Sequence, residues 1–199
     1  NTWSWGCRHD GCEAKPGLHQ VAPGRVQCDH ESLGRMWFDY DAPAGRDPTW
    51  LFTENESNLE GLFGAKNASP YVKDAFHRRL IEGQGEAVNP QHTGTKCAVH
   101  EVLELAPGEE RKLRLRLYAE AEQPAQSFGR GFDEVLQARA KEADEFYAAV
   151  LPARGRPETD SPMTVPGKSS VETQRVARQA YAGLLWSKQF YHYGVDEWL

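Results

Sequence analysis

Cysteine and histidine side chains that could bind a metal gather near the start of the chain. Cys7, Cys12 and Cys28 occur before residue 30, and His30 follows two positions after the third cysteine. Thiolates and imidazoles are zinc ligands, but this C-x4-C…C-x-H spacing differs from the C-x2-C pairs of compact zinc sites. We therefore expect unpaired thiols in an irregular loop. Bound zinc, or a disulfide such as Cys7–Cys12 or Cys7–Cys28, are the alternatives.

Two pairs of carboxylates are close enough in sequence to suggest acid–base chemistry. Glu54 and Glu56 are two residues apart, so an extended backbone would place them on one face. Asp196 and Glu197 are adjacent and point in different directions whatever the backbone, so they cannot flank one scissile bond. We expect residues 53–58 to form a structural loop, and the second pair to be a solvated feature of a helix end.

Charge and hydropathy exclude two classes of partner. The chain has 199 residues, with 23 basic and 29 acidic side chains and a formal net charge of -6. This balance argues against nucleic-acid binding, which normally needs a basic patch. The sequence contains no apolar run of about 18 residues, so we expect no membrane span.

The first two thirds of the chain favour β-structure, although residues 1–30 show no sustained period. Residues 34–40 alternate in polarity as a half-buried strand does, and residues 50–53 form a short apolar strand. Residues 97–105 and 111–119 are strand-like and flank Ala106-Pro107-Gly108-Glu109, which suits a type II turn. We expect a hairpin in which Leu113, Leu115 and Leu117 face a core.

Two helices should follow. Apolar residues recur at helical spacing from Phe132 to Val150, and Pro-rich residues 153–168 indicate a linker. Ser169 and Glu172 form a capping box, and Gly194 suits a C-terminal cap. From Tyr181 onward this second helix is apolar nearly all round, so it needs partners on every side. We expect it to be the first element of something larger.

Six strings resemble the bacterial family 63 glycoside hydrolases, which are α-glucosidase-like and related to mannosyl-oligosaccharide glucosidases. They occur in the same order with similar gaps and cover most of the chain, whereas residues 7–33 and 153–168 match poorly. The strings are NTWSWG (1–6), LFTENESN (51–58), NASPYVKDAFH (67–77), AVNPQHTGTK (87–96), FDEVLQARAKEADEFYA (132–148) and LLWSKQFYHYGVDEWL (184–199).

The resemblance implies an α+β internal fragment of a longer enzyme. Residues 1–125 would be the C-terminal part of an antiparallel β-sandwich with long loops, 126–168 a helical linker, and 169–199 the first helix of an (α/α)6 catalytic barrel. The family inverts the anomeric centre of α-linked substrates without a cofactor or metal, and its two carboxylates would lie beyond Leu199.

The fragment alone should therefore be inactive. In the whole enzyme Trp186, Gln189 and Tyr193, which fall on or near one helical face, would contact carbohydrate, with core packing as the alternative for this stripe. The resemblance favours a cytoplasmic location. A self-contained carbohydrate-binding β-sandwich is the competing interpretation.

Overall fold

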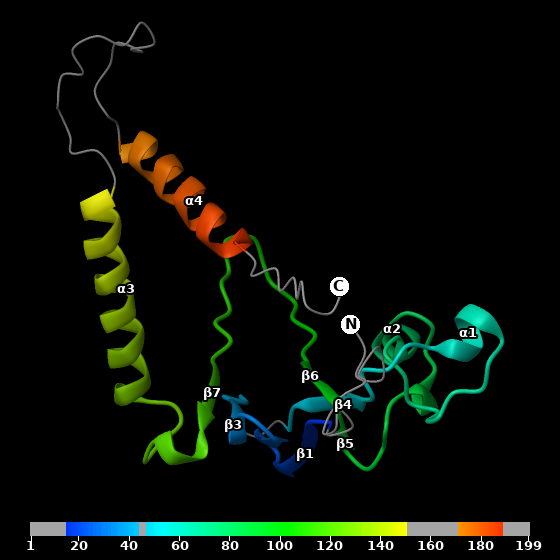
Figure 1. Ribbon diagram of the computed structural model, residues 1–199. Coiled ribbons are helices and arrows are strands. Elements are labelled where there is room, and N and C mark those ends of the chain that lie inside the picture. Colours follow the sequence, from blue (N-terminus) through cyan, green and yellow to red (C-terminus); the bar gives the residue numbers. More distant parts are fainter. Residues whose placement is uncertain (1–14, 44–46, 151–170, 189–199) are drawn as a thin grey trace, which may run out of the picture. The chain divides into compact units, whose positions relative to one another are not determined.

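Two antiparallel sheets form the first part of the chain in a computed structural model, which describes residues 15–43, 47–150 and 171–188. The chain divides into two compact units, Asn1–Gly129 and Arg130–Leu199. In the first unit a five-stranded sheet has the order β5-β1-β2-β3-β7, and a two-stranded sheet pairs β4 with β6. The strands are β1 (Gly17–Ala22), β2 (Arg25–His30), β3 (Gly34–Tyr40), β4 (Thr49–Thr53), β5 (Thr93–Gly94), β6 (Lys96–His100) and β7 (Leu115–Ala119) (Figure 1).

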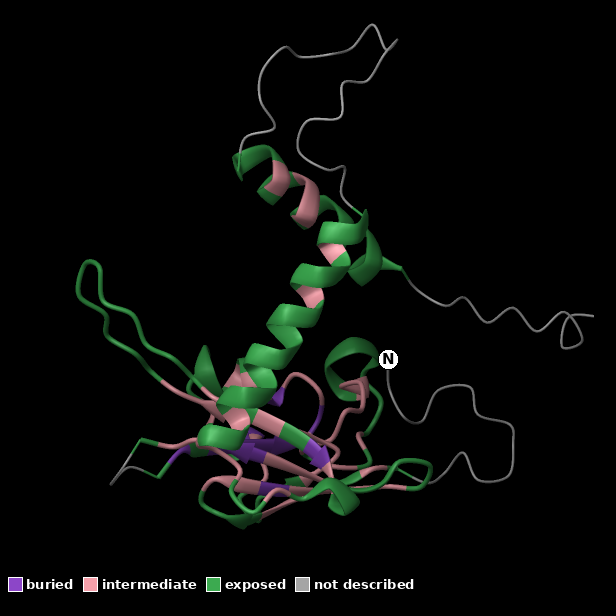
Figure 2. Ribbon diagram, turned by 90° about the vertical axis from the view of Figure 1, so that its left-hand side faces the viewer, coloured by how far each residue is buried: buried purple, intermediate pink, exposed green. Residues whose placement is uncertain are grey.

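The two sheets share one core, as in a β-sandwich. Val26 and Tyr40 come from the larger sheet, Trp50 and Phe52 come from the smaller one, and all four are at most 4% exposed. Phe38 meets Trp50 edge to face with 5.8 Å between ring centroids. The buried residues of this unit concentrate in its strands (Figure 2). The strands expected at residues 34–40 and 50–53 are confirmed.

The hairpin of β1 and β2 was not expected, because residues 1–30 show no sustained period. Its turn contains Pro23 and Gly24, and the peptide N–H of Tyr40 donates to the carbonyl of Gly24 at 2.9 Å. A Cβ on Gly24 would lie 2.8 Å from the Tyr40 carbonyl oxygen, so this close approach requires glycine. The Trp50 indole N–H donates to the carbonyl of Pro23 at 2.6 Å and ties the turn to the other sheet.

The expected hairpin of residues 97–105 with 111–119 is wrong in its pairing but right in its turn. The N–H of Glu109 donates to the carbonyl of Ala106 at 2.9 Å, and Gly108 has a φ of 79°, as a type II turn requires. However, β6 pairs with β4 and β7 pairs with β3. Residues 101–114 contain no strand and form an extended arm that connects β6 of the smaller sheet to β7 of the larger one (Figure 2).

The leucines of this arm and of β7 are also not in the core. Leu115 pairs with Tyr40 and Leu117 with Phe38, which places them on the core face of the larger sheet. Leu113, Leu115 and Leu117 are nevertheless 50%, 47% and 61% exposed. The smaller sheet has only two strands, and neither leucine of β7 belongs to the shared core.

Short helices occupy the long excursion between β4 and β5. They are α1 (Leu59–Phe63), α2 (Ala75–Leu80) and the 3-10 turn η1 (Gly85–Ala87), and a second 3-10 turn, η2 (Glu120–Glu122), follows β7. Ala75 and Ala87 are buried, as is Val72 just before α2. This excursion is thus fixed to the sandwich by small apolar contacts.

The second unit contains α3 (Arg130–Val150) and α4 (Val171–Ser187). The helix expected over residues 132–150 is confirmed, and the second helix is confirmed in type but ends at Ser187. Gly194 and the rest of residues 189–199 lie outside the described residues. Neither helix buries a described side chain, and no helix of the described ranges is long and apolar enough to cross a membrane. The molecule is therefore α+β with antiparallel sheets, as expected.

Candidate functional site

Of the cysteines and histidine near the start of the chain, the structure describes Cys28 and His30. Cys28 is a half-buried unpaired thiol on the core face of β2, and Cys97 of β6 packs against the same core. Burial raises the pKa of both thiols. The pKa of Cys97 rises to about 12, to which the nearby Cys28 thiol makes a smaller contribution. His30 Nδ1 accepts from the N–H groups of Ser32 and Leu33, so it caps a local turn.

Within the described ranges, no group of three or more His, Cys, Asp or Glu side chains could hold a metal ion. Cys7 and Cys12 lie outside those ranges, so the expected thiol chemistry of these two residues stays a prediction.

Of the aromatic stripe expected to contact carbohydrate, the structure describes only the first member. Trp186, near the end of α4, is 91% exposed, whereas Gln189 and Tyr193 lie outside the described residues. Trp186 is thus more exposed than Leu113 and Leu115, which are 50% and 47% exposed. The described part of α4 therefore presents an indole without forming a pocket around it.

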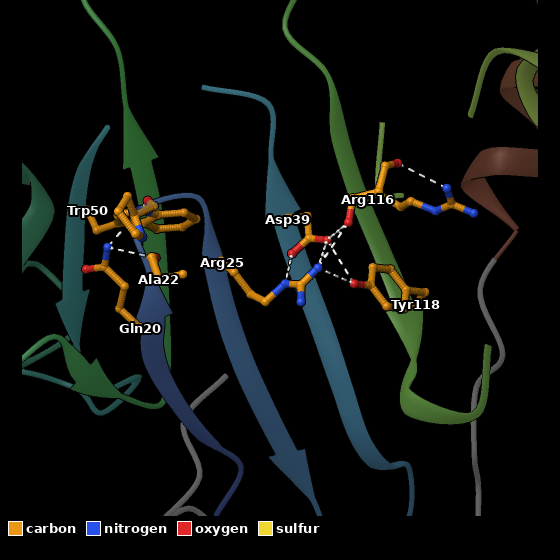
Figure 3. A network of polar contacts seen from close by, with 9 residues as sticks. Gln20, Ala22, Arg25, Asp39, Trp50, Arg116 and Tyr118 are labelled. Atoms are coloured by element: carbon orange, nitrogen blue, oxygen red, sulfur yellow. Dashed lines mark hydrogen bonds and ion pairs between the residues drawn. The ribbon is translucent and has the colours of Figure 1, made fainter. Parts of the chain in front are cut away.

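A buried polar network occupies the other face of the larger sheet (Figure 3). Asp39 is 3% exposed and accepts from Arg25 Nε at 2.6 Å and Arg25 Nη2 at 2.8 Å. The Tyr118 hydroxyl donates to Asp39 Oδ2 at 2.8 Å, and the Ser127 hydroxyl donates to the same oxygen. Burial alone would raise the pKa of Asp39, but hydrogen bonds from Arg25, Ser127 and Tyr118 outweigh it and lower that pKa.

This network has the properties of a structural ion pair. Arg25, Tyr118 and Ser127 all donate to the Asp39 carboxylate, and the side chains of the network line neither of the two cavities described below. It connects β2 and β3 to β7 and to residue 127, so it fixes the strand order of the larger sheet. We assign it to stability.

The loop that carries Glu54 and Glu56 is anchored on both sides as it leaves β4. The buried Thr53 hydroxyl donates to the carbonyl of Val72 at 2.8 Å. The Thr95 hydroxyl donates to Glu54 Oε2 at 2.9 Å and accepts from the N–H of Asn55 at 2.7 Å. Each hydroxyl thus ties the loop to a segment distant in sequence, and the expected structural role of residues 53–58 has a physical basis.

An asparagine clamp holds the next turn of the chain. Asn58 is the N-cap of α1: its Oδ1 accepts from the N–H of Gly61 at 2.9 Å and from Asn67 Nδ2 at 3.0 Å. Asn67 Oδ1 accepts from the N–H of Leu59 at 2.8 Å, while Asn58 Nδ2 donates to Asp74 Oδ2 at 2.9 Å. The Asn67 side chain is therefore occupied at both ends, although its sequence matches a glycosylation acceptor.

Two cavities open beside this clamp and share the segment 67–69. The first, of about 570 Å³, has the lining residues Lys15, Glu54, Glu56, Ser57, Leu59, Asn67, Ala68, Ser69 and Val72. The second, of about 610 Å³, has the lining residues Asn58, Glu60, Gly61, Lys66, Asn67, Ala68, Ser69, Pro70 and Arg78. Both volumes fall in the range of roughly 300–1,000 Å³ that is typical of small-molecule sites.

Glu54 and Glu56 line the same cavity, which agrees with their two-residue spacing. Lys15 lies 2.8 Å from Glu56 Oε1 and forms an ion pair with it. The sequence did not point to Lys15, Asn67 or Ser69, because their approach depends on the tertiary fold. The helix α1 did have a signal, since Asn58 precedes it and Gly64 follows it as a left-handed C-cap.

The chain is 39% identical over 164 residues to the uncharacterized protein YMR196W of Saccharomyces cerevisiae. The match covers 76% of this chain but only 14% of the yeast protein. No family model matches the chain, and no solved structure matches it. The name of the yeast protein assigns no activity, so function must be argued from the residues and their arrangement.

Proposed function

We propose that this chain is part of an inverting glycoside hydrolase that cleaves α-glucosidic or related α-linked bonds. In this proposal the chain contributes structural surroundings of the active site and not the catalytic carboxylates. The observation that carries the proposal is the resemblance of six strings to bacterial family 63 glycoside hydrolases, in the same order along the chain.

The folded arrangement of three of those strings supports the proposal. Residues 51–58, 67–77 and 87–96 are joined by side-chain hydrogen bonds: Thr53 to Val72, Asn58 to Asn67, and Thr95 to Glu54. The N–H of Lys73 also donates to the carbonyl of Glu56 at 2.8 Å. The segments that resemble the family thus hold one another in place, which is expected when one inherited substructure is the source of the resemblance.

An inverting mechanism needs a general acid and a general base roughly 6.5–9.5 Å apart, so that a water molecule fits between the base and the sugar. Glu54 and Glu56 do not suit these roles, because the Thr95 hydroxyl engages one and the Lys15 ammonium engages the other. The proposal therefore assigns the acid and the base to barrel segments beyond Leu199. Asp196 and Glu197 lie outside the described residues.

The exposed helices agree with a barrel assignment for residues 169–199. Leu184, Leu185 and Trp186 are 68%, 51% and 91% exposed at the end of α4. Side chains of this kind normally pack against neighbouring elements, and a contiguous exposed set marks an interaction surface. In the proposed enzyme, paired barrel helices cover this surface, and Trp186, Gln189 and Tyr193 contact carbohydrate at the barrel mouth.

The test compares this 199-residue chain with the proposed longer enzyme. Both are assayed against aryl α-glucosides and α-gluco-oligosaccharides, with β-glucosides as the control substrates. We expect turnover of α-linked substrates by the longer protein and none by the chain alone. Turnover by the chain that is lost on Glu54→Gln or Glu56→Gln would overturn the assignment of the catalytic pair. Sugar binding without turnover in the longer protein would favour the carbohydrate-binding β-sandwich.

A further inference from the structure

The cavity between the loop after β4 and residues 67–72 has a mixed lining that indicates a class of ligand. The Ser57 hydroxyl has no hydrogen-bond partner in the described part of the chain, and Glu54 engages only Oε2. The half-buried Leu59 and the exposed Ala68 add apolar surface. A few polar groups above an apolar patch is the usual construction of a small-molecule site.

The charges of this cavity select against ions. Two carboxylates and the Lys15 ammonium leave one net negative charge, which repels anions. Calcium takes six to eight oxygen ligands, whereas here Lys15 already occupies Glu56. Carboxylates and hydroxyls remain good partners for the hydroxyl groups of a neutral ligand, because a charged acceptor roughly doubles the strength of a hydrogen bond.

The second cavity extends the site beyond a single ring. It adjoins the first across the segment 67–69 and adds three charged groups, Glu60, Lys66 and Arg78. The three carboxylates and three cations that line the two cavities therefore balance, which suits a neutral ligand. The clamp of Asn58 and Asn67 fixes this shared segment before any ligand arrives, which lowers the entropy that binding must overcome. A ligand that spans both cavities is therefore larger than a single ring.

We propose that these two cavities form a non-catalytic binding site for a neutral saccharide of two or more rings. The choice of α-linked glucosides as the first ligands to test rests on the proposed function. The existence of the site is inferred from the two cavities and their lining residues. Glu54, through Oε1, and Ser57 hydrogen-bond the hydroxyl groups, and Leu59 lies beneath the C–H face of one ring.

The test titrates the 199-residue chain with maltotriose, and with cellotriose and trehalose for comparison, followed by saturation-transfer difference NMR. We expect saturable binding of maltotriose with a Kd on the order of 1 mM. Ala68→Phe, which fills the shared rim, should weaken binding at least about tenfold. Ala65→Phe is the matched control, because Ala65 is exposed and lines neither cavity, and its affinity should be unchanged. Glu54→Gln should weaken binding roughly tenfold.

Each outcome decides between alternatives. No saturable binding of any of these sugars, or unchanged binding by Ala68→Phe with a normal melting temperature, would overturn the proposal. Binding of calcium or inorganic phosphate in place of the sugars would overturn it as well. Hydrolysis by the longer protein is measured separately. Suppose that Ala68→Phe abolishes sugar binding to the chain while the longer protein with the same substitution still hydrolyses its substrate. The proposed function then stands, and this site is non-catalytic.

Discussion

Removal of the Asp39 carboxylate should be the most damaging polar substitution in the sandwich. In Asp39→Ala, the Arg25 guanidinium and the hydroxyls of Tyr118 and Ser127 lose their common acceptor. Loss of one partner of a buried pair costs roughly 3–5 kcal/mol. The Arg25 side chain is 30% exposed and can regain water, so we expect the lower end, about 3 kcal/mol. Ser127→Ala removes a single donor to a charged group and should cost about 1.5 kcal/mol.

The same network predicts a pH dependence with a definite sign. The pKa of Asp39 is lowered in the folded state, whereas an unfolded Asp titrates near ~3.9. Its stabilising contribution is therefore complete above that unfolded value and is lost as the pH falls through the lower folded pKa. The difference in unfolding free energy between wild type and Asp39→Ala should be largest at neutral pH and should shrink toward pH ~2.

Urea unfolding followed by tryptophan fluorescence measures both effects, because Trp37 and Trp50 lie in the sandwich. Glu110→Ala is the control, since Glu110 is exposed on the arm and takes no part in the network. A cost below about 1 kcal/mol for Asp39→Ala would contradict the assignment of this network to stability. So would an energy difference that stays constant between neutral pH and pH ~2.

Three further predictions concern the thiols, one glycine and the exposed helix. The pKa of Cys97 is raised to about 12, so little of this thiol is ionised at pH 8. Its reaction with iodoacetamide at that pH should be at least about a hundredfold slower in the native chain than in urea, as measured by peptide mass spectrometry. Gly94→Ala should lower the free energy of unfolding by about 1–3 kcal/mol, because its Cβ would lie 2.4 Å from the Thr53 carbonyl oxygen. The control Gly17→Ala has open space around its Cβ and should leave the melting temperature unchanged. Removal of residues 169–199 should reduce self-association and the binding of a hydrophobic dye, because it removes Trp186 and its apolar neighbours. Unchanged dye binding would count against an exposed apolar surface on α4.

The sequence predicted the strands whose side chains alternate clearly and missed those whose alternation is hidden. Residues 34–40 alternate Met, Phe and Tyr against polar residues, and they form β3. β2 also alternates, with Val26 and Cys28 on the core face and Gln27 on the other, but the polar His30 at the next core-face position obscures the pattern. Local polarity was therefore a good guide only where one face is uniformly apolar.

Strand pairing was the main thing that local sequence could not supply. Residues 106–109 do turn as predicted, yet each flanking strand finds its partner elsewhere, β6 with β4 and β7 with β3. A short turn favours a hairpin only if both strands lack better partners. Here the partner strands carry core residues: Trp50 and Phe52 of β4 belong to the shared core, and Phe38 of β3 packs against it.

The candidate site was not predicted as a site, because the sequence favoured a structural loop for residues 53–58. The spacing of Glu54 and Glu56 correctly indicated a shared surface, and the structure adds the cavity that they line. Lys15 and Asn67 also line that cavity, although Lys15 lies 39 residues before Glu54 in the sequence. No short motif predicts such tertiary contacts. The exposure of Trp186 agrees with the sequence, but the stripe that it begins stays a prediction.

We propose that this chain is part of an inverting hydrolase of α-linked glucosides, and the stereochemistry of that reaction can be observed. The most direct measurement is proton NMR of the first sugar released from an α-glucoside by the longer protein, recorded before mutarotation. The account predicts that the initial product is the β-anomer, with the α-anomer appearing only later as the two equilibrate. Release of the α-anomer first, or no hydrolysis of any α-linked glucoside, would contradict it.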